Sequence, residues 1–243
     1  MGNMVQSHTY LFSIVTMPIF ISCGEIEKKQ IEAASDGKTE NAGKFLPIDF
    51  SDSSFHDLPD YIADTVTADG WSIRYFIKDD SRKYTDLYLE CSKGNIKGTF
   101  YSAELLQRRR YFIPEFIGET NTNIYFAHGC ATDCSAILVF AKNSTANFTD
   151  YLSVIDYNIQ LGQVLFITDN THQGNDNIYE LSLADISRNK THKLTQNKIC
   201  DNVYKPACVD TVIFTKDQVV ITTSLRINIE DTTQTKQTTT IHL

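Results

Sequence analysis

The sequence predicts an all-β domain. Aromatic side chains are abundant, with 14 Phe and 12 Tyr among 243 residues, and they favour the pleated, half-buried surface of a strand. From Trp71 onward, short segments alternate between apolar and polar residues with the period of a β-strand. Gly, Asn and Asp occupy the connections between these segments. Short strands separated by such turn signals are typical of a sandwich, a barrel or a propeller.

The alternation places the expected strands along the chain. In Asn177–Leu183, for example, Tyr179, Leu181 and Leu183 share one face. One helix is expected over Ala103–Arg110, with Ser102 as its N-cap. The expected strands are Trp71–Lys78, Tyr84–Cys91, Ile96–Tyr101, Asn123–Ala127, Ala136–Ala141, Tyr151–Asp156, Gln163–Thr168, Asn177–Leu183, Lys190–Leu194, Asp210–Thr215, Gln218–Ser224 and Lys236–Leu243.

One segment, Val164–Thr195, carries a more specific pattern. A strand leads to Gly174-Asn175, a second strand begins with Asn177-Ile178-Tyr179, and a third ends in Leu194-Thr195. This order resembles a TolB-type β-propeller repeat. A four-stranded blade takes about 40–45 residues, which leaves room for about four blades. The resemblance implies a small or incomplete β-propeller-like domain, and a β-sandwich is the alternative.

The N-terminal region predicts export. The apolar run Tyr10–Ile21 is too short to span a bilayer, but it has the length of the hydrophobic region of a signal peptide. The run ends in Ser22-Cys23, which resembles the lipobox of bacterial lipoproteins, with Phe20 where the lipobox has Leu. The resemblance implies a lipidated Cys23 and a protein anchored in the bacterial cell envelope, periplasmic or surface-exposed. An ordinary cleaved signal and a buried apolar segment are the alternatives.

Composition divides the whole chain into three parts. Residues 1–22 are expected to be a signal peptide, 23–54 a lipidated cysteine with a flexible polar tether, and 55–243 the all-β domain. The net charge is −8, from 22 basic and 30 acidic residues. An acidic chain repels a phosphate backbone, so nucleic acid is not an expected partner. The expected partners are the membrane, through the lipid anchor, and a glycan or protein of the envelope.

Four cysteines form two close pairs, Cys130–Cys134 and Cys200–Cys208, and an exported protein is expected to oxidise such pairs to disulfides. Cys91 is left over and is expected to be a buried free thiol. Two alternatives use the neighbouring His128. In one, His128 and the cysteines bind zinc. In the other, His128 is the base for a cysteine nucleophile.

The sequence contains few other chemical signals. The loop Asp169–Glu180 approximates a calcium-binding loop, with Asp169, Asp176 and Glu180 as candidate ligands. A polar hairpin loop is the alternative. No cofactor is expected, and calcium at this loop is the alternative. Four side chains are candidates for ligand contact, namely His128, Trp71, Tyr125 and Tyr179, although aromatic residues in such positions are also expected in the core.

No catalytic motif such as G-x-S-x-G or H-E-x-x-H occurs in the sequence. We therefore expect a binding or structural module for a glycan, peptide or protein ligand rather than an enzyme. Two alternatives remain open. One is an envelope hydrolase that uses carboxylates on its loops. The other is a protein inhibitor with a loop braced by a disulfide.

Overall fold

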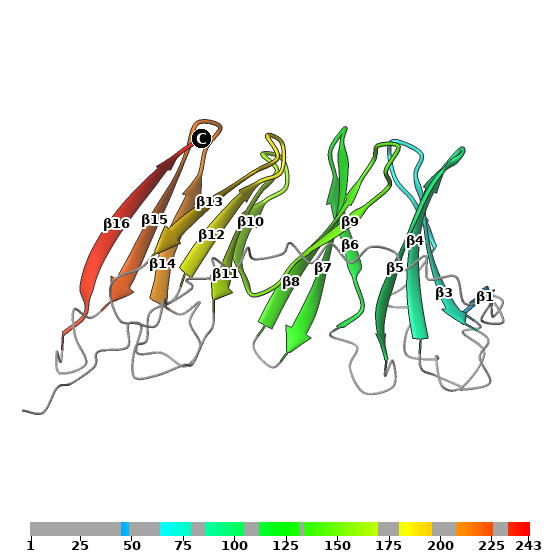
Figure 1. Cartoon of the computed structure of the whole chain (residues 1–243), viewed down its shortest axis with the longest axis horizontal. Coiled ribbons are helices and arrows are strands. Elements are labelled where there is room, and N and C mark those ends of the chain that lie inside the picture. Colours follow the sequence, from blue (N-terminus) through cyan, green and yellow to red (C-terminus); the bar gives the residue numbers. More distant parts are fainter. Residues whose placement is uncertain are drawn as a thin grey trace, which may run out of the picture. The chain divides into compact units, whose positions relative to one another are not determined.

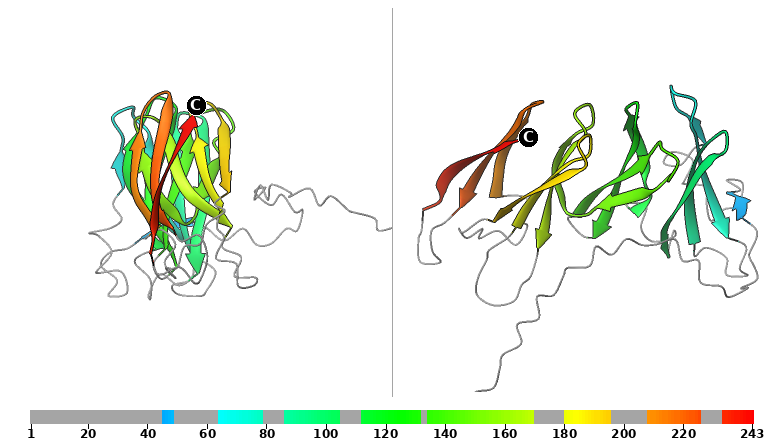
Figure 2. Two further views of the ribbon diagram at one scale, coloured as in Figure 1. Left: turned by 90° about the vertical axis from the view of Figure 1, so that its left-hand side faces the viewer. Right: turned by 45° about the horizontal axis from the view of Figure 1, so that its top comes forward.

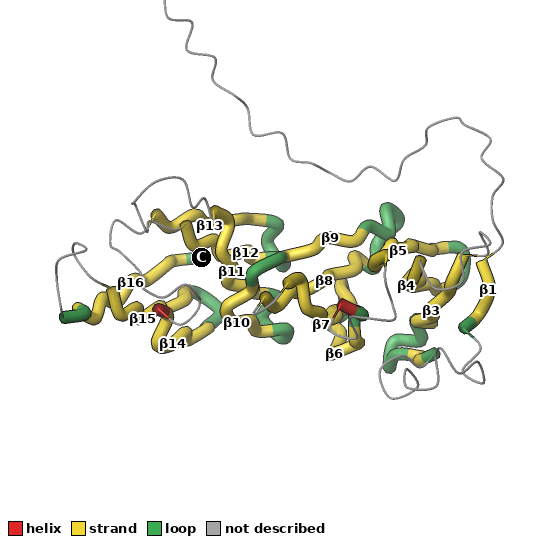
Figure 3. Tube along the Cα trace, turned by 90° about the horizontal axis from the view of Figure 1, so that it is seen from below, coloured by secondary structure: helices red, strands yellow, loops and turns green. Residues whose placement is uncertain are grey.

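A computed structural model describes residues 45–48, 64–78, 86–104, 112–131, 134–169, 180–195, 208–225 and 233–243. The chain divides into two units, Met1–Ala42 and Gly43–Leu243, and all described residues belong to the second unit. Strands and turns make up almost the whole described trace (Figure 3). The predicted all-β class is therefore confirmed.

The strands form four antiparallel sheets that follow one another in chain order (Figure 1). The first sheet contains β1 (Phe45–Pro47), β2 (Thr65–Val66), β3 (Ser72–Lys78), β4 (Asp86–Lys93) and β5 (Ile96–Glu104). The second contains β6 (Glu115–Glu119), β7 (Asn123–Ala131), β8 (Cys134–Ala141) and β9 (Phe148–Tyr151). The third contains β10 (Val154–Asn158), β11 (Gln163–Asp169), β12 (Glu180–Asp185) and β13 (Lys190–Thr195). The fourth contains β14 (Val209–Phe214), β15 (Gln218–Leu225) and β16 (Thr235–His242).

Consecutive strands are hydrogen-bonded neighbours in the second, third and fourth sheets. In the first sheet, β1 and β2 both pair with β3, and β3, β4 and β5 then follow in order. Among the described strands, no sheet closes into a barrel. The first hairpins of the four sheets turn at residues 67–71, 120–123, 159–162 and 215–218. These turns lie at one end of the sheets, which we call the turn end (Figures 1 and 2).

Three apolar clusters lie between neighbouring sheets. Trp71, Leu89 and Phe140 belong to the cluster shared by the first and second sheets. Tyr125 and Val164 belong to the cluster shared by the second and third sheets. The cluster shared by the third and fourth sheets includes Leu165, Leu183, Val219 and Ile221. The two middle sheets therefore bury apolar side chains on both faces, which accounts for most of the core.

This arrangement explains two different strand patterns. In β8, every residue from Ala136 to Phe140 is buried, because Ile137 and Val139 contact the third sheet while Leu138 contacts the first. A strand that is covered on both faces reads as a continuous apolar run. In β15, buried and half-buried residues alternate strictly, because only one face of the fourth sheet packs against a described neighbour.

Most expected strands are confirmed, but three local predictions were wrong. The predicted helix over Ala103–Arg110 is contradicted at its start, because Ala103 and Glu104 are the last residues of β5; residues 105–110 lie outside the described residues. The single strand expected over Tyr151–Asp156 is two strands, interrupted at Ser153, which has a φ of 54°. Three strands, β1, β2 and β6, were not expected, and β1 lies within residues 23–54, which were predicted to be a flexible tether.

Candidate ligand-binding cavity

A cavity of about 510 Å³ opens at the turn end. Its walls come from turns of the first, second and third sheets. Ligand pockets in proteins have volumes of roughly 300–1,000 Å³, so this cavity has the size of a site for a small molecule. The lining residues are Ala68, Asp69, Glu119, Thr120, Asn121, Thr122, Asn123, Tyr125, Gln160, Leu161, Gly162 and Ser187.

Threonine hydroxyls fix the first hairpin turn in three of the four sheets. Thr67 Oγ1 accepts a hydrogen bond from Trp71 N at 3.2 Å, and Thr120 Oγ1 accepts one from Asn123 N at 3.2 Å. In the fourth sheet, Thr215 Oγ1 accepts one from Gln218 N at 3.1 Å. Such side-chain bonds stabilise a tight turn locally. They hold the backbone of two of the cavity's walls in defined positions.

The wall from the third sheet joins two turns. In the first, Asn158 Oδ1 accepts a hydrogen bond from Leu161 N at 3.0 Å. Gly162 follows with a φ of 65°, a left-handed conformation that favours glycine. The Gly162 carbonyl accepts a hydrogen bond from Ile186 N at 2.8 Å, which ties this turn to the turn between β12 and β13. Ser187 of the second turn thereby lies beside Gly162 in the lining.

Asp185 holds the turn that carries Ser187. Its side chain is fully buried and accepts hydrogen bonds from Ser187 Oγ at 2.7 Å and from Arg188 Nη1 at 2.6 Å. Burial raises the pKa of Asp185, but the bonds from Ser187 and Arg188 and the positive charge of Arg188 lower it more. Arg188 Nη2 also donates to the Lys216 carbonyl at 3.2 Å, which links the third sheet to the fourth.

Behind the opposite wall lies a nearly buried ammonium group. The Lys142 side chain is only 3% exposed. Its Nζ donates to Asp69 Oδ2 at 2.6 Å, to the Thr120 carbonyl at 2.7 Å and to Glu119 Oε2. These three acceptors belong to cavity-lining residues of the first and second sheets. Lys142 thus joins two sheets and balances carboxylate charge at the cavity wall.

The carboxylate of Glu119 is held in its ionised form. Its Oε1 accepts a hydrogen bond from Asp69 N at 3.0 Å, in addition to the bond from Lys142. Burial raises the pKa of Glu119, but the bonds from Lys142, Asp69 and Thr67 lower it more. A catalytic general acid requires a raised pKa, so Glu119 does not have the electrostatics of that role.

Tyr125, a predicted ligand contact, lines the same cavity. The residue is 1% exposed, and its hydroxyl oxygen has no hydrogen-bond partner among the described residues. Burial raises the pKa of Tyr125, and the polar side chains of Thr120 and Asn123 lower it by less. Neither side chain is close and well aligned enough to form a hydrogen bond with the phenol oxygen. A methyl group at Gly162 would lie 3.5 Å from the Tyr125 oxygen. A buried hydroxyl without a partner is costly and rare, so this group requires an explanation.

The other predicted residues lie elsewhere. Trp71 is 4% exposed and packs edge-on against Phe140, with ring centroids 5.3 Å apart, so it is part of the core. Glu180 Oε1 lies 3.3 Å from Lys193 Nζ and accepts a hydrogen bond from Thr168. Asp169 ends β11, and no group of three or more potential metal ligands occurs within the described residues. Four predicted residues, Cys23, Tyr179, Asp176 and Cys200, lie outside the described residues.

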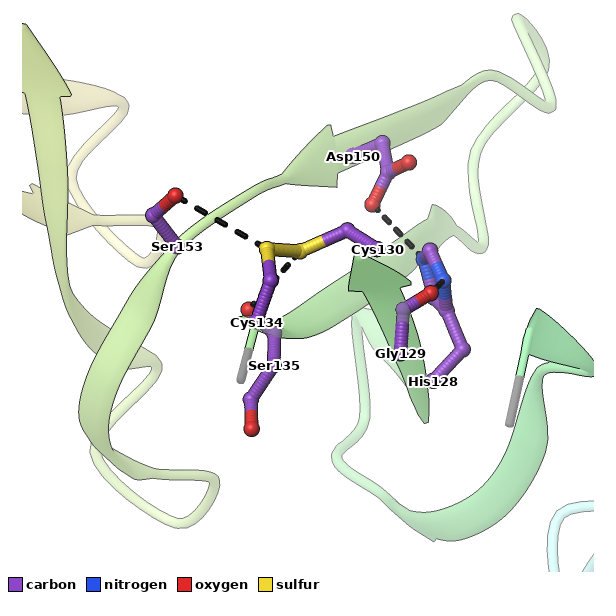
Figure 4. Close-up of a disulfide and its surroundings, with 7 residues drawn as sticks. All are labelled: His128, Gly129, Cys130, Cys134, Ser135, Asp150 and Ser153. Atoms are coloured by element: carbon purple, nitrogen blue, oxygen red, sulfur yellow. Dashed lines mark hydrogen bonds and ion pairs between the residues drawn. A yellow bond between two sulfur atoms is a disulfide. The ribbon is translucent and has the colours of Figure 1, made fainter. Parts of the chain in front are cut away.

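His128 lies in the second half of β7, away from the turn at residues 120–123 from which that strand begins. Figure 4 shows its side chain with Gly129 and Asp150. Its Nδ1 is 2.8 Å from the Gly129 carbonyl oxygen, and its Nε2 is 3.0 Å from Asp150 Oδ1. Both ring nitrogens therefore face acceptors, an arrangement that only the protonated imidazolium satisfies. Burial lowers the pKa of His128, but the hydrogen bond and charge of Asp150 raise it more, so that the net shift is upward.

The predicted disulfide Cys130–Cys134 is confirmed beside this pair, with Cα atoms 5.1 Å apart (Figure 4). Ser153 Oγ lies 3.8 Å from the Cys134 sulfur. The disulfide leaves no thiolate at Cys130 or Cys134 for binding zinc or for nucleophilic attack. Both alternative predictions for His128, as a zinc ligand and as the base for a cysteine nucleophile, are therefore wrong. Cys208 is also disulfide-bonded. Cys91 is a free, buried thiol as predicted, and burial raises its pKa.

Comparison of the chain with protein-family models, with curated proteins and with solved structures found no match. Within the described part of the chain, no helix is long and apolar enough to cross a membrane. Sequence reasoning identified Tyr125 but not its neighbours in the cavity. The usable signals were the turn residues Thr120 to Asn123, which lead into the predicted strand Asn123–Ala127, and Gly162, which directly precedes the predicted strand Gln163–Thr168.

Proposed function

We propose that this protein is a lipid-anchored binding module of the bacterial cell envelope, whose ligand occupies the cavity at the turn end. The observation that carries the proposal is the Tyr125 hydroxyl, which is buried at a cavity wall without a partner among the described residues. A ligand that completes this hydrogen bond would explain why the oxygen is retained there. This missing hydrogen-bond partner is the reason for proposing that the protein binds a ligand rather than having a purely structural role.

Export is supported by the state of the cysteines. Cys130 and Cys134 are joined, and Cys208 is also disulfide-bonded. Disulfides persist in the periplasm and at the cell surface, where the environment is oxidising. This agrees with the signal-like run before Cys23. The protein would then be held at the membrane by the acyl chains on Cys23, because two or more chains give stable anchoring.

A propeller-like architecture is supported by strand order. The second and third sheets are four-stranded meanders, the topology of a propeller blade. Their cores lie between successive sheets, and three such interfaces occur among the four sheets. A two-sheet sandwich has one face-to-face interface, so a small, open propeller fits these sheets better.

Binding is favoured over hydrolysis by the partners of the carboxylates. Glu119 and Asp69 share the Lys142 ammonium, and Asp150 pairs with His128. The pKa of Glu119 is lowered by its bond to Lys142 and its other hydrogen bonds, which outweigh burial, whereas a catalytic acid requires a raised pKa. The inhibitor alternative relies on the loop between Cys130 and Cys134, whose tip lies outside the described residues.

The proposal is tested by the intact mass and location of the protein in a bacterial host. We expect the wild-type chain in the membrane fraction, with a mass that begins at Cys23 and includes acyl chains. The Cys23→Ala variant should lose the acyl mass and leave the membrane fraction, whereas the control Cys91→Ala should behave as wild type. An unmodified wild-type chain in the soluble fraction would contradict the anchor.

A further inference from the structure

The charges around the cavity disfavour an ionic ligand. Within the described lining there is no Lys, Arg or His, so a phosphate or carboxylate ligand would find no cation. The two carboxylates, Asp69 and Glu119, already share the Lys142 ammonium, and Lys93 Nζ donates to the Asp69 carbonyl. A cationic ligand would therefore have to compete with lysines that are already in place.

The remaining lining groups suit a neutral ligand with many hydroxyls. Besides Tyr125, six lining residues carry side-chain hydroxyls or amides, namely Thr120, Asn121, Thr122, Asn123, Gln160 and Ser187. Hydroxyls and amides both donate and accept hydrogen bonds, as the hydroxyls of a sugar do. Leu161 and Ala68 are the only aliphatic side chains in the described lining, so an apolar ligand would find little surface to bury. The volume of 510 Å³ suits a ligand of about one or two sugar rings.

Tyr125 and Gly162 form the most specific part of the site. A methyl group at position 162 would lie 3.5 Å from the Tyr125 oxygen and 3.4 Å from Ser187 N, and so would cover the hydroxyl. Glycine at this position leaves the space beside the phenol oxygen free of a side chain. Gly94 offers a comparison, because it has a similar φ of 58° but nothing within 4 Å of a methyl group.

Resting on the proposed function, we infer that the cavity binds a neutral saccharide unit, with the Tyr125 hydroxyl hydrogen-bonded to a ligand oxygen beside Gly162. The polar turn residues supply the other hydrogen bonds. The carboxylates, balanced by Lys142, accept from sugar hydroxyls without requiring a charged ligand.

The test is calorimetric titration of the full chain, purified in a detergent that contains no sugar. The probes are N,N′-diacetylchitobiose and maltose as neutral saccharides, inorganic phosphate as an anion and putrescine as a cation. We expect saturable binding of at least one disaccharide. Tyr125→Phe should weaken that binding about five- to tenfold, the effect of one lost hydrogen bond. Gly162→Ala should weaken it at least as much.

Two matched variants control for folding. Gly94→Ala introduces the same backbone strain as Gly162→Ala, and Tyr75→Phe removes a buried hydroxyl outside the cavity lining. Both should bind the disaccharide with wild-type affinity. The inference is overturned if neither disaccharide binds, if only phosphate or putrescine binds, or if Tyr125→Phe and Gly162→Ala bind as tightly as wild type. A wild-type chain that binds saccharide but lacks acyl chains on Cys23 would contradict the anchor and leave this inference standing.

Discussion

Replacing Tyr125 with Phe removes one buried oxygen and no ring atom. The Tyr125 hydroxyl is shielded from water and has no partner within the described residues, and such a group costs about 1–3 kcal/mol. Tyr125→Phe should therefore raise the free energy of unfolding by about 1 kcal/mol or more in the absence of ligand. Most core substitutions have the opposite sign.

Tyr75→Phe provides the matched comparison. Tyr75 is 6% exposed, but its hydroxyl donates to the Pro114 carbonyl at 2.6 Å. Removing that donor leaves a buried carbonyl without its partner and should lower the free energy of unfolding by about 1–2 kcal/mol. The same chemical change thus has opposite expected signs at two buried tyrosines.

Urea unfolding followed by circular dichroism measures both variants under identical conditions without ligand. In thermal unfolding, about 1 kcal/mol corresponds to a Tm shift of about 2–4 °C for a domain of this size. A Tyr125→Phe variant as strongly destabilised as Tyr75→Phe would refute the reasoning, because it would show that the Tyr125 hydroxyl already has a partner in the ligand-free protein.

Three further substitutions test other parts of the structure. Lys142→Met leaves the carboxylate of Glu119 without its cation and should lower the free energy of unfolding by about 3 kcal/mol in urea titrations; an unchanged value would contradict the role of Lys142 in joining the two sheets. Burial lowers the pKa of His128, but Asp150 raises it by more, so that the pKa lies above 6.5 in the folded protein. The His128–Asp150 pair therefore stabilises the fold fully below pH 6.5, and this stabilisation is lost as the pH rises through the pKa of the folded protein. His128→Asn should therefore lower Tm more at about pH 6 than at about pH 9, and a pH-independent loss would argue against the pair. Gly98→Ala places a methyl group against the neighbouring sheet and should cost about 1–3 kcal/mol, whereas wild-type stability in urea would indicate looser packing there.

Most strands were predictable because the order of apolar and polar residues in each strand reflects whether one or both of its faces are buried. In β15, strict alternation reflects one covered face, and in β8 a continuous apolar run reflects two. The strand β6 was missed because its sequence, EFIGE, has only two large apolar residues and contains Gly118 at an irregular register. Its pairing with β7 outweighs its weak local preference.

Strand boundaries between sheets were less predictable. The segment Tyr151–Asp156 reads as one strand, but Ser153 adopts a positive φ and lets the chain pass from the second sheet to the third. A non-glycine residue in that conformation has no clear sequence signal. In the predicted helix over Ala103–Arg110, pairing of Glu104 with Asp86 keeps the first residues in β5.

The recurrence of the same turn in three of the sheets could not be recognised from the sequence, for a different reason. Thr67, Thr120 and Thr215 fix corresponding turns, but the residues that they hold, Trp71, Asn123 and Gln218, differ in type. The spacing is four residues in the first turn and three in the other two. Sequence comparison along the strands could not detect this relation.

The cavity was not predictable as a unit, since turns from three sheets meet there. Of the lining residues, only Tyr125 was predicted from the sequence to contact a ligand, and it was chosen for its aromatic ring. Its role in the structure comes instead from a hydroxyl beside Gly162.

The most direct test of the account is NMR of the full chain labelled with ¹³C at the ζ carbon of tyrosine, the carbon that bears the hydroxyl. N,N′-diacetylchitobiose and maltose are each titrated in turn, and the Tyr125 and Tyr75 signals are assigned by their absence in the Phe variants. We predict that at least one disaccharide shifts the Tyr125 signal saturably and leaves the Tyr75 signal in place. A Tyr125 signal that does not move while a disaccharide binds, or that moves with neither, would contradict the assignment of this hydroxyl to the ligand site.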